Sequence, residues 1–126
     1  MPVVVDAGLV GTVAQVSPGR AVVRLISDRS TRVGVTVAGG AARGLVEGRG
    51  GEVVRATSFD VAADVPAGSL LVTAGTPGSL YPPGIPIGTV ERVEVDGGAQ
   101  QKVADVRLAP RLADLAYVTV LLHRAS

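Results

Sequence analysis

The sequence of 126 residues contains no cysteine and no tryptophan, and it has only two tyrosines, one phenylalanine and one histidine. The lack of cysteine excludes disulfides and thiolate metal sites. So few aromatic side chains also exclude the stacking platforms on which single-stranded nucleic acids bind. The formal net charge of +1 gives no overall attraction to nucleic acid or to anionic lipid. We therefore expect no nucleic-acid partner and no metal or other cofactor.

Long apolar runs are absent too, although 47% of the residues are hydrophobic and only 18% are charged. No run approaches the roughly 18 residues that a membrane-spanning helix needs. The length and apolar content suffice to bury a core in one domain or in two very small ones. A strand-like run, Pro2 to Val5, follows Met1 directly, and we interpret the chain as a fragment of a longer protein.

Short valine-rich segments, separated by Gly, Pro, Ser or Asp, fill most of the sequence. In one of them Val33, Val35 and Val37 alternate with Gly34 and Thr36, which is the period of a β-strand with one buried face. The pattern predicts about ten strands, at Val3 to Val5, Leu9 to Val16, Ala21 to Ile26, Arg32 to Val37, Gly44 to Glu47, Glu52 to Ala56, Leu70 to Thr73, Ile87 to Val95, Gln101 to Leu108 and Val118 to Leu122.

Strands at this spacing, punctuated by 17 glycines and 8 prolines, indicate an all-β fold. We predict two small β-barrels with short Gly/Pro-rich connections and very little helix. The first would comprise residues 1–60 and the second residues 61–126. The boundary is placed where the sequence F-D-V-A-A-D-V-P loses the valine alternation.

The most distinctive segment is V-T-A-G-T-P-G-S-L-Y-P-P-G-I-P-I-G-T-V at residues 72–90. Its prolines fix φ, and its glycines permit sharp reversals, so it predicts a rigid loop between two strands. The apolar centre of the loop would lose little entropy on binding, which makes it a candidate protein-binding site. Alternatively, the loop closes the end of its own barrel with Tyr81 and Ile85 turned inward. The candidate residues are Leu80, Tyr81, Pro82, Pro83, Ile85 and Pro86.

Catalytic alternatives rest on two residues. His123, three residues from the end, would need a buried acid and a serine to work as a catalytic base. Asp6, in the sequence V-D-A-G, resembles the Asp-Thr/Ser-Gly motif of small dimeric aspartic proteases, in which two carboxylates share a proton. Ala7 lacks the hydroxyl of that motif, and Asp-x-Gly is ordinary turn chemistry. A hydrolase using Asp6 and a ligand-binding β-barrel remain the alternatives to a non-catalytic binding protein.

A series of motifs resembles the family of the rod shape-determining protein MreC. It comprises G-L-V-G-T-V from Gly8, L-I-S-D-R-S from Leu25, R-G-L-V-E-G from Arg43, D-V-P-A-G from Asp64 and the proline loop. The order and spacing of the motifs carry the resemblance, which spans almost the whole chain. Ser69 departs from it, because the family commonly has an acidic residue there.

The resemblance implies a non-enzymatic scaffold of the bacterial cell-elongation machinery, built as a pair of barrels without a catalytic triad. It implies a place on the outer face of the cytoplasmic membrane, with an anchoring helix, a coiled coil and the first barrel strand upstream of Met1. The implied partners are a class B penicillin-binding transpeptidase, the membrane protein MreD, the MreB system and further copies of the protein itself.

Overall fold

The structure is a computed structural model that describes residues 2–60, 63–75, 81–98, 100–110 and 119–120. All regular elements in these ranges are β-strands, and none of the described residues forms a helix long and apolar enough to cross a membrane. The strands are β1 (Pro2–Val5), β2 (Gly8–Ser17), β3 (Arg20–Leu25), β4 (Arg32–Val37), β5 (Arg43–Glu47), β6 (Val53–Asp60), β7 (Leu70–Thr73), β8 (Pro86–Asp96), β9 (Gln101–Leu108) and β10 (Thr119–Val120).

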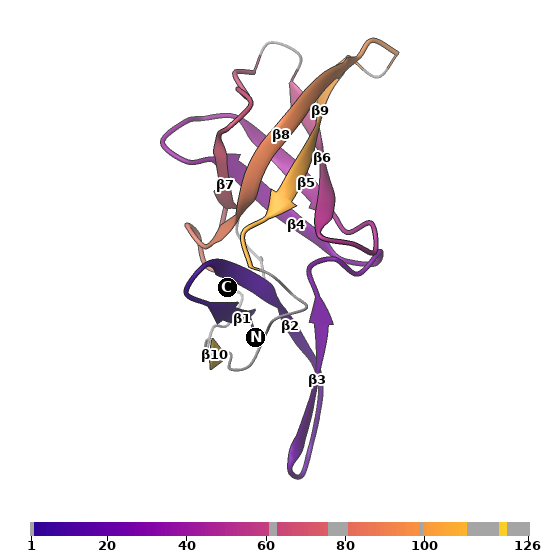
Figure 1. The fold of residues 1–126 in the computed structure, drawn as a ribbon, viewed down its shortest axis with the longest axis vertical. Helices are drawn as coiled ribbons and strands as arrows, with labels where there is room; N and C mark the ends of the chain where they lie inside the picture. The colour runs from indigo at the N-terminus through magenta and orange to yellow at the C-terminus, as the bar shows by residue number, and fades with distance from the viewer. Residues whose placement is uncertain (1, 61–62, 76–80, 99, 111–118, 121–126) are drawn as a thin grey trace.

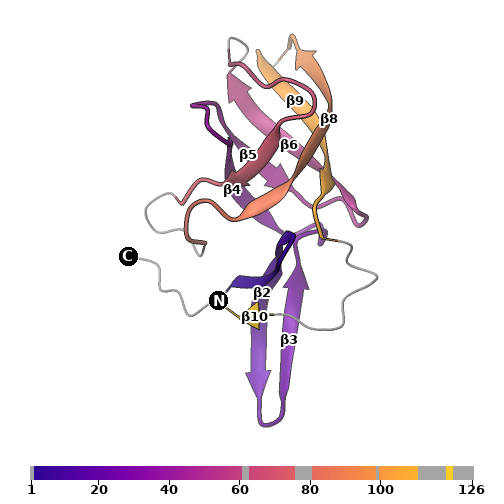
Figure 2. The ribbon, with the colours of Figure 1, turned by 60° about the vertical axis from the view of Figure 1, so that its left-hand side comes forward.

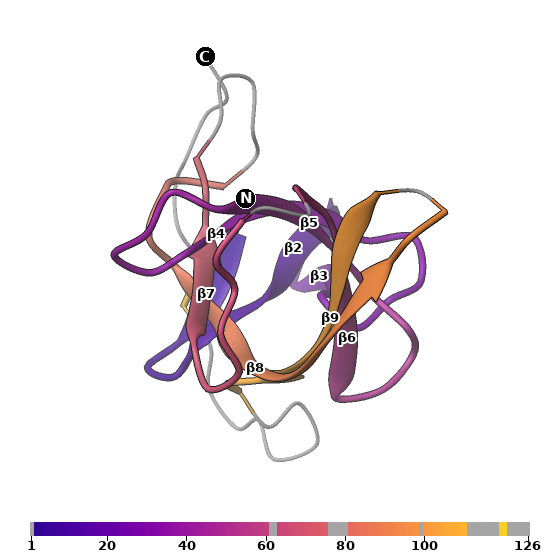
Figure 3. The ribbon, with the colours of Figure 1, turned by 90° about the horizontal axis from the view of Figure 1, so that it is seen from above.

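Six of the strands close into an antiparallel barrel in the order β4-β5-β6-β9-β8-β7, and the pairing of β4 with β7 completes the ring. The ring is visible in the view from above (Figure 3). The other four strands form an antiparallel sheet in the order β10-β1-β2-β3, which lies below the barrel in Figure 1. The all-β class and the presence of a closed barrel are therefore confirmed.

The division of the chain into units differs from the one we expected. Residue 60 ends β6, and β6 and β7 both belong to the same barrel. The change of sheet falls between β3 and β4 instead, and the chain returns to the first sheet with β10. The loss of valine alternation around residues 57–66 marks a β-bulge and a connection within the barrel. Within the described residues, the second unit is a four-stranded sheet.

The two units share one hydrophobic core. In β4, Val33, Val35 and Val37 turn into the barrel as their alternation predicts. Leu9 from β2 and Ile26, which directly follows β3, are fully buried in the same cluster of side chains. The four-stranded sheet is therefore packed onto the barrel and does not hang from a linker.

A bulge in β6 sets the position of the single phenylalanine. Val54 and Ala56 point inward, and Ser58 then takes a left-handed conformation with φ of 66° while the pairing with β9 shifts register. Plain alternation after Val54 and Ala56 would turn Phe59 outward. The extra residue of the bulge turns it to the core instead, where it is fully buried. Gly44 of the neighbouring β5 makes room, because a β-carbon there would lie 2.7 Å from the Phe59 ring.

A loop of the barrel rests on the connection between β3 and β4. The N–H of Gly48 donates to the Thr31 carbonyl at 3.3 Å, and the N–H of Gly50 donates to the Ser27 carbonyl at 2.7 Å. The sequence G-R-G-G at residues 48–51 lies in the hairpin connection between the antiparallel strands β5 and β6. These backbone contacts join the barrel to the sheet.

Candidate protein-binding site

The proline loop connects β7 to β8, and Thr73 at the end of β7 holds its described part, residues 81–85, in place. The Thr73 Oγ1 donates to the Pro82 carbonyl at 2.6 Å and accepts from the Ile85 N–H at 2.9 Å. Its backbone makes two further bonds, to the Ile85 carbonyl and from the Gly84 N–H, both at 2.9 Å. Thr73 is itself only 1% exposed. The loop is therefore a braced structure, as its prolines predict.

Tyr81 and Ile85 turn towards the protein interior. Tyr81 is 7% exposed and belongs to the core, and the half-buried Ile85 packs against the same cluster. Burial raises the pKa of the Tyr81 hydroxyl above its ordinary value, and the nearby charge of Arg24 partly offsets that rise. Both residues thus follow the alternative in which the loop closes on its own barrel. Leu80 lies outside the described residues.

The outer side of the loop is formed by Pro82, which is half-buried, and by Pro83 and Gly84, which are exposed. We call these three residues the proline ridge. The ring of Pro83 lies against Gly75, where an added β-carbon would lie 2.5 Å from the Pro83 Cβ. The ridge is therefore rigid and loses little entropy on contact with a partner.

The inner side of the loop touches the four-stranded sheet at Gly8, the first residue of β2. A β-carbon on Gly8 would lie 2.3 Å from the carbonyl oxygen of Pro86, so only glycine allows this approach. Pro86 is half-buried by the contact. The roles of Thr73 and Gly8 were not predicted from the sequence, although a threonine directly before a Gly/Pro-rich loop is a signal of a side chain that can bond backbone groups.

Asp6 lies in the exposed turn between β1 and β2, which confirms the turn interpretation of V-D-A-G. The described residues include no group of three or more His, Cys, Asp or Glu side chains that could hold a metal ion. His123 falls outside the described ranges. Asp6 is therefore positioned as a turn residue on the surface.

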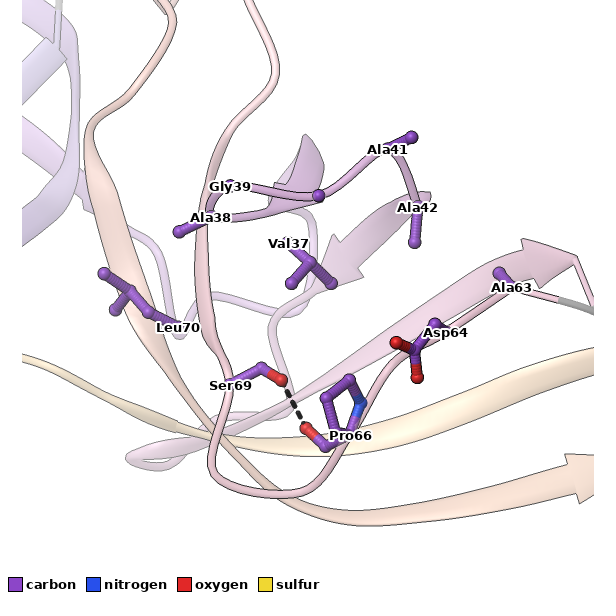
Figure 4. A pocket seen from close by; sticks show the side chains of 11 residues that line it. Val37, Ala38, Gly39, Ala41, Ala42, Ala63, Asp64, Pro66, Ser69 and Leu70 are labelled. Atoms are coloured by element: carbon purple, nitrogen blue, oxygen red, sulfur yellow. Dashed lines mark hydrogen bonds between the residues drawn. The ribbon is translucent and has the colours of Figure 1, made fainter.

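A recess of about 680 Å³ lies at one end of the barrel, between the β4–β5 turn and residues 63–70 (Figure 4). Its lining consists mostly of small side chains, with a single carboxylate from Asp64. The Ser69 hydroxyl donates to the Pro66 carbonyl at 2.5 Å, within the loop that forms one wall. The eleven lining residues thus provide a shaped surface but no acid–base pair.

The Asp28 carboxylate braces the connection between β3 and β4, and it provides a test of the local geometry. It accepts hydrogen bonds from the Ser30 hydroxyl at 2.6 Å and from the Ser30 N–H at 2.8 Å, which lower the pKa of Asp28 from 3.8. Its contribution to stability is therefore present above the unfolded-state pKa and is lost as the pH falls through the folded-state pKa.

We expect Ser30→Ala to raise the pKa of Asp28 towards its ordinary value, because the first of these two bonds is then lost. The midpoint for the Asp28 carboxyl carbon, followed by NMR between pH 2 and 6, measures the change. The unaltered protein, titrated under the same conditions, provides the reference midpoint for Asp28. An unchanged midpoint for Asp28 would contradict the described geometry.

Taken together, the fold and its surfaces define a class: a small all-β barrel protein whose described residues offer rigid contact surfaces. Comparison with protein families gives the particular family. A family model described as "Rod shape-determining protein MreC, barrel core" matches residues 1–122. The chain belongs to the MreC family.

Curated relatives agree. The chain is 32% identical over 130 aligned residues to the cell shape-determining protein MreC of Listeria monocytogenes, covering 99% of this chain and 44% of the relative. It is 36% identical over 108 residues to MreC of Bacillus subtilis, covering 79% of this chain and 37% of the relative. The chain thus spans less than half the length of these relatives.

Solved structures share the fold. A crystal structure of MreC from Pseudomonas aeruginosa matches with a TM-score of 0.86 and 31% identity, over 93% of this chain and 76% of that one. A structure titled as a complex between penicillin-binding protein PBP2 and MreC from Helicobacter pylori matches with a TM-score of 0.70 and 18% identity, over 88% of this chain and 68% of that one. At that identity the second match shows the fold alone.

Proposed function

We propose that this chain is the extracytoplasmic barrel region of a non-catalytic scaffold, which binds a class B penicillin-binding transpeptidase and positions it for side-wall synthesis. The observation that carries the proposal is membership in the MreC family over residues 1–122. The solved complex between PBP2 and MreC from Helicobacter pylori supports the choice of partner. An upstream anchor would hold the chain at the outer face of the cytoplasmic membrane.

Binding alone can regulate such a partner. A scaffold that binds one conformation of a transpeptidase more tightly than another shifts the population towards that conformation. The shared core of sheet and barrel favours this role, because a rigid surface does not deform to fit both conformations equally. MreD, the MreB system and further copies of the protein are included in the proposal as partners.

We further propose that the proline ridge, Pro82 to Gly84, is part of the binding surface. Of the candidate loop residues, Tyr81 and Ile85 pack in or against the hydrophobic core, so replacing them would disturb folding together with binding. Pro83 is exposed and rigid, and it therefore reports on contact more cleanly.

The test measures affinity between this chain and the extracytoplasmic region of the class B transpeptidase from the same organism, by calorimetry. We expect Pro83→Arg to weaken binding by about tenfold or more, because a buried unpaired charge opposes association. Gly97→Arg is the control, since Gly97 lies in the β8–β9 turn and an added β-carbon there meets no atom within 4 Å.

Two outcomes would contradict the proposal at different levels. If the unaltered chain does not bind the transpeptidase, the proposed function is wrong. If it binds and Pro83→Arg leaves the affinity unchanged, the ridge is not the binding surface. The alternative hydrolase predicts peptidase activity that Asp6→Asn abolishes, and a peptidase assay on these two proteins decides that question separately.

A further inference from the structure

The hairpin of β2 and β3 projects away from the rest of the molecule as a two-stranded arm (Figure 2). The pairing of β1 with β2 ends at Pro2 and Thr12, so residues 13–17 of β2 have β3 as their only neighbour strand within the described residues. Two-stranded ribbons are marginally stable in water by themselves. An arm of this kind gains stability if a further strand is added to it.

The cross-strand pairs divide the arm into two different faces. Val13 pairs with Val23, and Val16 pairs with Ala21, so one face is wholly aliphatic. It is also open to solvent, since Val16 is 77% exposed. The opposite face pairs Thr12 with Arg24, Gln15 with Val22 and Ser17 with Arg20.

The outer edge of β3 presents unpaired backbone groups. The Ile26 N–H donates inward to the Val10 carbonyl at 2.8 Å. Because backbone groups alternate between the two sides of a strand, the N–H and C=O groups of Ala21 and Val23 point away from β2. The Leu25 carbonyl points the same way, but it accepts bonds from the Asp28 N–H at 3.0 Å and the Thr31 hydroxyl at 2.8 Å. β3 is the last strand of its sheet within the described residues, so the outward groups of Ala21 and Val23 form a free edge.

All charged side chains of the arm are positive. Arg20 and Arg24 are the only charged residues between Asp6 and Asp28. Both lie on β3 and on the same face, and both side chains are exposed. Neither forms a salt bridge within the described part of the chain. A strand laid along this edge would place its own alternate side chains beside these two guanidinium groups.

We propose that the free edge of β3 binds an extended segment of a partner protein in which aliphatic and acidic residues alternate. The partner's backbone would pair with Ala21 and Val23 and extend the sheet by one strand. Its aliphatic side chains would continue the face of Val16 and Ala21. Its carboxylates would pair with Arg20 and Arg24. This inference concerns a surface separate from the proline ridge and does not depend on which protein supplies the segment.

The test uses a capped octapeptide of alternating valine and glutamate, with a valine and lysine octapeptide as the matched control. NMR chemical-shift titration of the labelled chain gives both the affinity and the location. We expect the glutamate peptide to shift the β3 amide signals and to bind at least about tenfold more tightly than the lysine peptide. The double variant Arg20→Glu, Arg24→Glu is expected to reverse this preference.

Ala21→Pro tests the backbone pairing. It removes an outward N–H and keeps the inward ladder to β2, so the hairpin should stay folded while the affinity for the glutamate peptide falls severalfold. Circular dichroism checks the fold. Equal binding of both peptides, or an affinity unchanged by Ala21→Pro, would overturn the proposal. A concentration-dependent dimer that Ala21→Pro abolishes would also overturn it, because the occupant of the edge would then be a second copy.

Discussion

Replacing Phe59 with alanine is expected to lower the free energy of unfolding by about 3–5 kcal/mol. Phe59 is fully buried, and among the described residues it is the largest side chain that is fully buried. Its removal leaves a cavity against Gly44, a position that has no side chain to fill the space. The bulge at Ser58 fixes the backbone on either side, so the barrel wall has little freedom to collapse into the cavity.

Chemical denaturation of the two proteins measures this effect through the transition midpoint. Val95→Ala is the matched control. It also shortens an apolar side chain of a barrel strand, but Val95 is 59% exposed. We expect the control to change the free energy of unfolding by no more than about 0.5 kcal/mol. A loss below about 1 kcal/mol for Phe59→Ala would show that this ring is not central to the core.

The strands were predictable because valine alternation and Gly/Pro punctuation are local signals. The segments Arg32–Val37, Leu70–Thr73 and Gln101–Leu108 agree residue for residue with β4, β7 and β9. The strand predicted at Glu52 to Ala56 was too short, since β6 continues to Asp60. A bulge inverts the inward and outward positions, so the alternation breaks while the strand continues.

The grouping of strands was not predictable, because it depends on contacts between residues far apart in the sequence. The barrel closes by pairing β4 with β7 and β6 with β9, across the residue 60 boundary that local composition had indicated. Periodicity states which residues of a strand face the core, but it does not state which strand is the neighbour. Local composition therefore divided the strands of one barrel between two predicted units.

The candidate site was only partly visible in the sequence. Prolines and glycines predicted a rigid loop, and the structure describes a braced one. Whether Tyr81 faces a partner or its own barrel depends on how the strands pack around the core, which no local motif encodes. The binding role of Pro82, Pro83 and Pro86 stays a prediction.

Replacing Gly48 with alanine is expected to destabilise the protein by about 3 kcal/mol, because its β-carbon would lie 2.0 Å from the carbonyl oxygen of Asp28. That neighbour is backbone, so relief requires the loop to move. Movement would weaken the bonds from Gly48 to Thr31 and from Gly50 to Ser27, each worth about 1 kcal/mol. The contact between the barrel and the sheet would loosen as a result.

Gly51→Ala provides the control within the same loop, since a β-carbon at Gly51 meets nothing within 4 Å. Thermal unfolding should show a large decrease in Tm for Gly48→Ala and almost none for Gly51→Ala. Amide hydrogen exchange adds the location, because loosening at this contact speeds exchange at Gly48 and Gly50 more than in the central barrel strands. Equal effects of the two substitutions would mean that the loop does not rest on the β3–β4 connection. The close packing of the sheet onto the barrel, which the proposed binding surface requires, would then have to come from other contacts.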